Sequence, residues 1–252
     1  MNDQPLAFGS ANHLVGVASI PAGDLAQNQL PAIVMSNIGV NHRVGPSRLY
    51  VELSRELAFH GFVAMRFDLS GLGDSALSSD ARVDAERWVS DCQSAMDLLT
   101  ERFHRTEFIF IGLCSGVDTV HSIALADHRV VGAVFVDGYS FNTPKHRINR
   151  LIQRAKSRYL WRQFLARRFP RLTRGVLDTQ WLRDRPAVFV RQPMSQGQFK
   201  NDLQHMIDRN LKLSFRFTGD FERTFSYVDQ FHEMVHPVAS RGRVDVHLHS
   251  AA

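Results

Sequence analysis

The residues best suited to chemistry lie together in the segment Gly112-Leu113-Cys114-Ser115-Gly116, which separates an apolar run from a helical pattern. In this glycine–x–nucleophile–x–glycine form, a sharp strand-to-helix turn exposes the central side chain, and the small residues let strand and helix approach each other. The central residue is Cys114, and a thiol at a helix N-terminus is readily ionised to the nucleophilic thiolate. We therefore predict nucleophilic catalysis at Cys114; the alternative is a buried structural cysteine in a glycine-rich turn.

Ser115, the neighbouring hydroxyl, is the poorer nucleophile. Leu113 and Val117 stand two positions before and after it, where the turn needs small residues. Its backbone N–H is the more useful group, because the residue after the nucleophile commonly donates a hydrogen bond to the oxyanion formed during acyl transfer. We predict that Ser115 contributes this N–H.

The elements that must position the turn follow from short apolar runs that alternate with helical patterns. We predict an opening hairpin at 6–9 and 13–19 and further strands at 32–36, 62–67, 107–111, 130–136, 211–218 and 243–249. Helices are predicted at 46–60, 84–103, 116–125 and 224–235. Continuous apolar strands followed by amphipathic helices indicate an α/β fold, in which helices cover both faces of a mostly parallel sheet.

The regular alternation stops between residues 138 and 207, which we interpret as an insertion into one core formed by residues 1–137 and 208–252. From Lys145 to Arg185 there are 13 basic and two acidic residues, a net charge of +11. The whole chain carries +5, so the remainder carries −6. Within the insertion Ile148, Leu151 and Ile152 recur at helical spacing with arginines between them, which predicts a basic amphipathic helix.

The overall composition excludes several classes of protein. Among the 252 residues 44% are hydrophobic and 22% charged, which is usual for a globular domain and unlike a disordered, collagen-like or coiled-coil chain. Two cysteines cannot form a disulfide scaffold, and neither they nor His232 and His236 complete a metal-ligand pattern. The N-terminus has no secretory signal pattern, and no apolar run reaches the roughly 20 residues of a membrane span. We expect a soluble, cytoplasmic protein without cofactor or metal.

Three motifs together make the chain resemble the α/β-hydrolase superfamily. One is the turn at 112–116; the second, residues 68–75, reads Asp-Leu-Ser-Gly-Leu-Gly-Asp-Ser and is similar to the D-x-x-G-x-G-x-S loop of that family. The third, residues 36–42, aligns with its His-Gly loop, although Asn37-Ile38 replaces His-Gly. The closest resemblance is to bacterial serine-aminopeptidase-like hydrolases, including those associated with exosortase loci. Most members carry serine in the turn, whereas cysteine there resembles dienelactone hydrolases and some thioesterases.

The resemblance implies an acyl hydrolase, an esterase or thioesterase, that acts on small acyl esters or thioesters; peptidase and lactone hydrolase activities stay open. It implies an oxyanion hole from the N–H groups of Gly39 and Ser115, and it makes Asp68 a turn-organising residue. The triad acid follows the penultimate strand, which indicates Asp220, with Asp137 as the competing residue. The family's histidine follows the last strand, about two residues past Ala252 by this comparison, and His249 is the fallback within the chain.

The insertion stands where this superfamily places a cap over the active site. Its charge suggests as partners an acidic acyl carrier protein, an anionic glycan or an anionic membrane surface, with Trp161 and Trp181 as aromatic anchors. Nucleic acid is not expected, because no nucleic-acid-binding motif accompanies the charge. The alternative function is therefore a catalytically impaired binding protein whose basic cap recognises an acidic partner.

Overall fold

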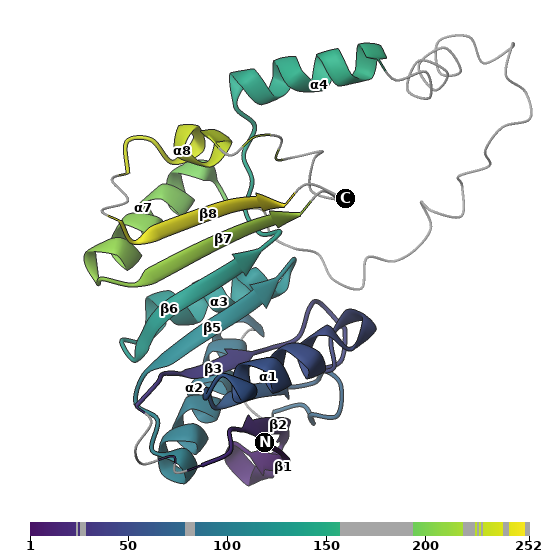
Figure 1. Cartoon of the computed structure of the whole chain (residues 1–252), viewed down its shortest axis with the longest axis vertical. Coiled ribbons are helices and arrows are strands. Elements are labelled where there is room, and N and C mark those ends of the chain that lie inside the picture. Colours follow the sequence, from purple (N-terminus) through teal and green to yellow (C-terminus); the bar gives the residue numbers. More distant parts are fainter. Residues whose placement is uncertain are drawn as a thin grey trace, which may run out of the picture.

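The computed structural model describes residues 1–23, 25, 29–78, 84–156, 194–218, 225, 227, 229–238 and 242–249. Its centre is an eight-stranded sheet with the order β1-β2-β4-β3-β5-β6-β7-β8 (Figure 1). The strands are β1 (Asn2–Phe8), β2 (Leu14–Ile20), β3 (Ala32–Met35), β4 (Ala64–Asp68), β5 (Phe108–Leu113), β6 (Val130–Val136), β7 (Lys212–Thr218) and β8 (Val244–His249).

Six of these strands, β3 to β8, run parallel to one another. Only the opening hairpin differs: β1 pairs antiparallel with β2, and β2 pairs antiparallel with β4. The pairs from β4 through β3, β5, β6 and β7 to β8 are all parallel. The carboxyl ends of the parallel strands therefore meet at one edge of the sheet, where ligand sites of parallel α/β sheets lie. The predicted α/β fold with a mostly parallel sheet is confirmed.

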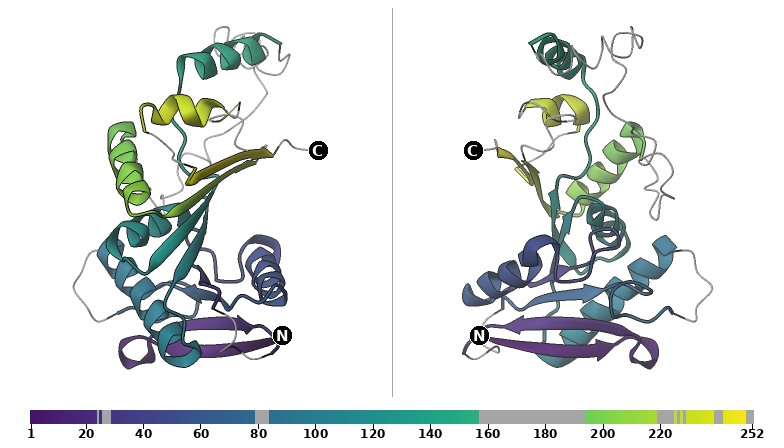
Figure 2. Two further views of the ribbon diagram at one scale, coloured as in Figure 1. Left: turned by 60° about the vertical axis from the view of Figure 1, so that its left-hand side comes forward. Right: turned by 90° about the vertical axis from the view of Figure 1, so that its right-hand side faces the viewer.

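Helices cover the two faces unequally (Figure 2). One face carries α1 (Leu49–Phe59), which packs on a small core that includes Ile33, Met35 and Tyr50. The larger core lies on the other face, where buried side chains come from α2 (Asp84–Phe103), α3 (Gly116–Ala126), α7 (Gln196–Asp208) and α8 (Asp229–Val235). Its aromatic centre stacks Phe135 on Phe215, with ring centroids 4.8 Å apart. Burial of these large side chains is the main favourable contribution to stability.

Two predicted helices begin later than expected. Residues 46–48 form a 3₁₀ turn ahead of α1, because Ser47 and Arg48 adopt positive φ angles of 48° and 65°. The helix predicted from 224 begins at Asp229. Phe225 stacks its ring on Phe217 of β7, with centroids 3.6 Å apart.

The region predicted as an insertion contains two described helices with different surroundings. Helix α4 (Pro144–Lys156) stands at the end of the molecule beyond α8 (Figure 1). In contrast, α7 packs into the larger core through Phe199, Leu203 and Met206, so residues 196–208 pack with the sheet. Trp161 and Trp181 lie outside the described residues. None of the helices in the described part of the chain is long and apolar enough to span a bilayer.

Candidate active site

Cys114 occupies the sharp turn between β5 and α3, at the carboxyl edge of the sheet. Its φ angle is +55°, a left-handed conformation that a non-glycine residue seldom adopts. The backbone N–H of Cys114 donates a 2.8 Å hydrogen bond to the carbonyl oxygen of Val136, which ties the turn to the end of β6. The side chain is exposed and forms no disulfide, whereas Cys92, the other cysteine, is buried. The turn thus presents the thiol to an incoming molecule.

The two glycines of the turn are sterically required. A Cβ atom on Gly112 would lie 2.7 Å from the carbonyl oxygen of Gly116. A Cβ atom on Gly116 would lie 2.8 Å from the carbonyl oxygen of Asn37. Both distances are shorter than carbon and oxygen tolerate without displacement, so the predicted need for small residues on both sides of Cys114 is met by close backbone contacts.

Gly39 lies beside Ser115, as the expected oxyanion hole requires. Gly39 has a φ of +55°, and a Cβ atom there would lie 3.3 Å from the Ser115 hydroxyl oxygen. Within the described part of the chain, neither the Gly39 N–H nor the Ser115 N–H donates a hydrogen bond to another protein group. Two amide donors close to the Cys114 turn are therefore available to a developing negative charge.

The loop that carries Gly39 is held in place by Asp68, at the end of β4. Asp68 is fully buried and accepts hydrogen bonds of 2.7 Å from the Asn37 side-chain amide and from the Arg43 backbone N–H. The side-chain oxygen Oδ1 of Asn37 in turn accepts a 2.7 Å hydrogen bond from the Leu69 N–H. A Cβ atom on Gly73 would overlap the Asp68 carboxylate at 2.3 Å, so the second loop also closes around it. These contacts agree with the expected turn-organising role of Asp68.

The Arg43 guanidinium completes this network. Beside it lie His42, Asp68 and Asp74, whose possible ligand atoms are close enough to one another to hold a metal ion. Arg43 Nη1 contacts Asp68, lies 2.8 Å from Asp74 and 2.9 Å from His42 Nε2. The guanidinium thus supplies positive charge where a metal would. The importance of Asn37 and Arg43 was missed from the sequence, because only their contact with a buried carboxylate from a distant strand reveals it.

Of the two candidate acids for the triad, only Asp137 lies among the described residues. Asp137, just after β6, accepts 2.7 Å hydrogen bonds from both the backbone N–H and the hydroxyl of Thr218. Its two oxygens are therefore used to join the ends of β6 and β7. Asp220, the preferred acid, lies outside the described residues.

The candidate base His249 is not brought to Cys114. His249 pairs with Thr218 at the end of β8, three strands away from β5. At about 4.8 Å per strand this separation is roughly 14 Å, beyond hydrogen-bond reach. The exposed His247 instead pairs with Asp245 at 2.9 Å. In the part of the chain that the structure describes, no histidine hydrogen-bonds Cys114.

A family model for serine aminopeptidase, S33, matches residues 34–203, which include the Gly39 loop, the Asp68 loop and the Cys114 turn. The chain belongs to the serine aminopeptidase S33 family of hydrolases. As an S33-family chain with an eight-stranded, mostly parallel sheet, it has the α/β-hydrolase fold. The description of the family names serine, whereas the central residue of this protein's turn is Cys114.

Solved structures with the fold of this S33-family protein are distant in sequence. An esterase of Pyrococcus furiosus is 12% identical at a TM-score of 0.60, over 99% of this chain and 82% of that one. A protein of Pseudomonas aeruginosa is 16% identical at a TM-score of 0.56, over 100% and 86%. A structure reported with carboxylesterases of Nitrososphaera gargenis is 13% identical at a TM-score of 0.52, over 99% and 90%. A search of curated proteins found no match.

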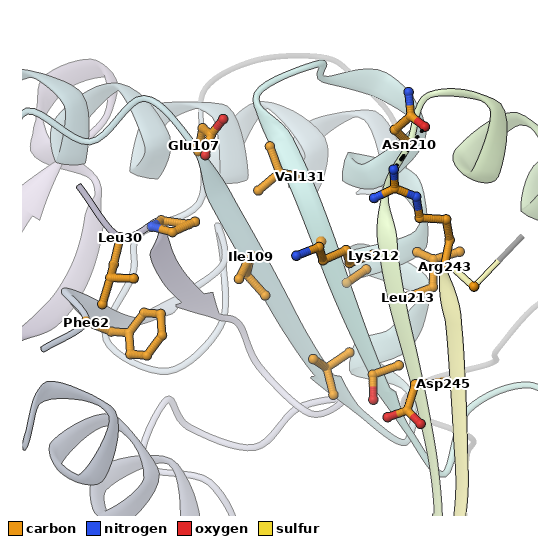
Figure 3. A pocket seen from close by; sticks show the side chains of 16 residues that line it. Leu30, Phe62, Glu107, Ile109, Val131, Asn210, Lys212, Leu213, Arg243 and Asp245 are labelled. Atoms are coloured by element: carbon orange, nitrogen blue, oxygen red, sulfur yellow. Dashed lines mark hydrogen bonds between the residues drawn. The ribbon is translucent and has the colours of Figure 1, made fainter. Parts of the chain in front are cut away.

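A large hollow of the S33-family fold lies away from the Cys114 turn (Figure 3). Its volume is about 850 Å³, and it lies against the first residues of β5 to β8, where Ile109, Val131, Lys212 and Arg243 line it. Cys114 follows the opposite, carboxyl end of β5 and is absent from the lining. This hollow and the Cys114 turn are therefore separate features of the described structure.

Proposed function

We propose that the protein is an acyl hydrolase, an esterase or thioesterase, with Cys114 as its nucleophile. The observation that carries the proposal is the exposed thiol on a left-handed turn, beside the N–H groups of Gly39 and Ser115. Such a turn costs conformational energy, and strain of this kind is concentrated at functional sites. Membership of a hydrolase family supports the same reaction type.

In the proposed reaction the thiolate of Cys114 attacks the acyl carbonyl and forms a C–S bond. The carbonyl oxygen becomes an oxyanion, which accepts hydrogen bonds from the N–H groups of Gly39 and Ser115. Collapse of this intermediate breaks the bond to the leaving alcohol or thiol, which departs with a proton. Water then hydrolyses the acyl-enzyme, releasing the carboxylic acid and regenerating the thiol. We assign to Asp220 the orientation of the triad histidine that the family resemblance places after the last strand; that histidine would take the thiol proton and pass it to the leaving group.

A thiol nucleophile favours thioesters as the substrate class. Transfer of an acyl group from a thioester to the Cys114 sulfur replaces one thioester by another of similar energy. A serine hydroxyl, in contrast, needs a base to remove its proton before it can attack. Cysteine is partly ionised near neutral pH and attacks activated acyl groups with less assistance from a base. We therefore expect the Cys114 enzyme to prefer acyl thioesters to alkyl esters of the same acyl group.

The chain offers a matched control for the nucleophile, because it has two cysteines in different surroundings. Turnover of short p-nitrophenyl esters and acyl thioesters should disappear in Cys114→Ala and persist in Cys92→Ala, which alters only the buried side of α2. Circular dichroism of both variants checks that the fold is retained. Equal turnover by Cys114→Ala and the unmodified protein would refute the assignment.

The alternative is a catalytically impaired member whose basic insertion recognises an acidic partner, such as an acyl carrier protein. It is favoured by one observation: no described histidine hydrogen-bonds Cys114. This alternative predicts no turnover of any acyl substrate, together with binding of an acidic protein that weakens as salt is added. Turnover that depends on Cys114 would exclude it.

A further inference from the structure

Helix α4 is anchored to the rest of the protein at its first residues. Thr143, just before the helix, shares a 2.5 Å hydrogen bond with the Tyr227 hydroxyl. The Lys145 ammonium lies 4.4 Å from the centre of the Tyr227 ring, a cation–π contact. His146 is fully buried, which shows that this side of the helix faces the protein. These contacts fix which side of α4 faces outward.

The outward side is apolar. Ile148 and Ile152, one turn apart, are 57% and 48% exposed, among the most exposed large hydrophobic side chains of the described chain. At 100° per residue, they lie on the side of the helix roughly opposite His146. The sequence continues this spacing with Leu151 and Ala155. Among the described residues Ile148 and Ile152 are left largely uncovered, and an exposed apolar stripe of this kind indicates an external contact.

Cations flank the stripe. The exposed Arg147 stands on one side of the stripe, and Lys145, whose ammonium lies over the Tyr227 ring, stands on the other. The α4 sequence contains no acidic residue. A helix with a central apolar stripe and lysine or arginine on its flanks fits a surface that offers an apolar layer bordered by negative charge. The boundary between lipid headgroups and acyl chains supplies both.

We propose that α4 is a docking surface for an anionic lipid bilayer. The helix lies in the plane of the interface, with Ile148 and Ile152 among the upper acyl-chain atoms and Arg147 beside the lipid phosphates. At 13 residues α4 is too short to cross the hydrocarbon layer, so it rests on the surface. This docking is independent of catalysis at Cys114.

The test uses the full chain and co-sedimentation with phosphatidylcholine vesicles, with or without phosphatidylglycerol. We expect binding to the anionic vesicles alone, falling as sodium chloride is added. The double variant Ile148→Ser, Ile152→Ser should bind at least about tenfold more weakly, because two apolar side chains no longer enter the interface. Phe59→Ser removes a 79% exposed apolar side chain from α1 and should bind like the unmodified protein.

A second pair of variants tests the charge. Arg147→Gln should lower binding about fivefold, the effect of one cation near an anionic surface, whereas Arg102→Gln, in the last turn of α2, should change little. Equal binding to neutral and anionic vesicles would overturn the proposal. The proposal would also be overturned if the α4 variants bound as well as the unmodified protein. It would likewise fail if the protein bound polyglutamate, an acidic-protein mimic, but not vesicles.

Discussion

The carbonyl oxygen of Asn37 lies so close to the α-carbon of Gly116 that a methyl group on Gly116 would approach it to 2.8 Å. The side chain of the same asparagine bonds the carboxylate of Asp68. Asn37 therefore joins three segments far apart in the sequence: its own loop, the end of β4 and the Cys114 turn. Displacement of any one of these segments should therefore shift the N–H groups of Gly39 and Ser115.

The contact between Gly116 and Asn37 predicts the effect of Gly116→Ala. The added methyl group pushes the Asn37 loop away and misplaces the Gly39 N–H, so kcat should fall by about 10²–10³, the usual effect of losing one oxyanion donor. Steady-state ester hydrolysis measures this. The control is Gly197→Ala in α7, where a Cβ atom meets nothing within 4 Å and activity should be unchanged. Equal activity of the two variants would contradict the role given to this contact.

The burial of Asp68 predicts a large loss of stability in Asp68→Asn. The neutral amide leaves the positive charge of Arg43 without its buried partner, and broken buried ion pairs cost about 3–5 kcal/mol. Urea denaturation measures the change in the free energy of unfolding. Asp97→Asn, which removes the more exposed partner of Arg129, should have a much smaller effect. A similar loss of unfolding free energy in both variants would show that the Asp68 network stabilises the fold no more than an exposed ion pair does.

The two candidate acids are separated by a pair of matched variants. Asp220→Asn should lower kcat by about 10⁴, as expected when a triad histidine loses its orienting carboxylate. Asp137→Asn should keep most of the activity and lower the thermal midpoint, because Asp137 joins the ends of β6 and β7 through Thr218. Kinetics and thermal unfolding of both variants decide the matter. The reverse pattern of activity would make Asp137 the acid.

Buried His121 predicts a pH dependence of stability. Burial lowers the pKa of His121, although its 2.9 Å contact with Asp202 acts in the opposite direction. Between the lower pKa of the folded state and about 6.5, the usual histidine value, the unfolded chain binds the extra proton. Stability should therefore fall as pH decreases through this window.

Urea midpoints measured across the same pH window test the role of His121. The decline should be shallower in His121→Gln and unchanged in His60→Gln, which alters an exposed histidine at the end of α1. An identical decline in all three proteins would assign the pH dependence to other groups.

The sequence predicts those parts of the structure that depend on local patterns. The helix Asp84–Phe103 and the strand Val130–Val136 have the predicted ends, because amphipathic spacing and an unbroken apolar run define them. The packing of Phe225 on Phe217 was not predictable, since it depends on a contact between separate segments. The roles of Asn37 and Arg43 were hidden for the same reason: their partner, Asp68, comes from a distant strand.

The most direct test of the account identifies the atom that carries the acyl group. The full chain is mixed with p-nitrophenyl acetate, quenched with acid within one turnover, digested and analysed by mass spectrometry. We predict that fragment ions place one acetyl group on Cys114 and not on Ser115 of the same peptide, with none on the peptide that contains Cys92. An acetyl group on Ser115 in the unmodified protein would contradict the central claim. So would continued turnover of the ester by Cys114→Ala.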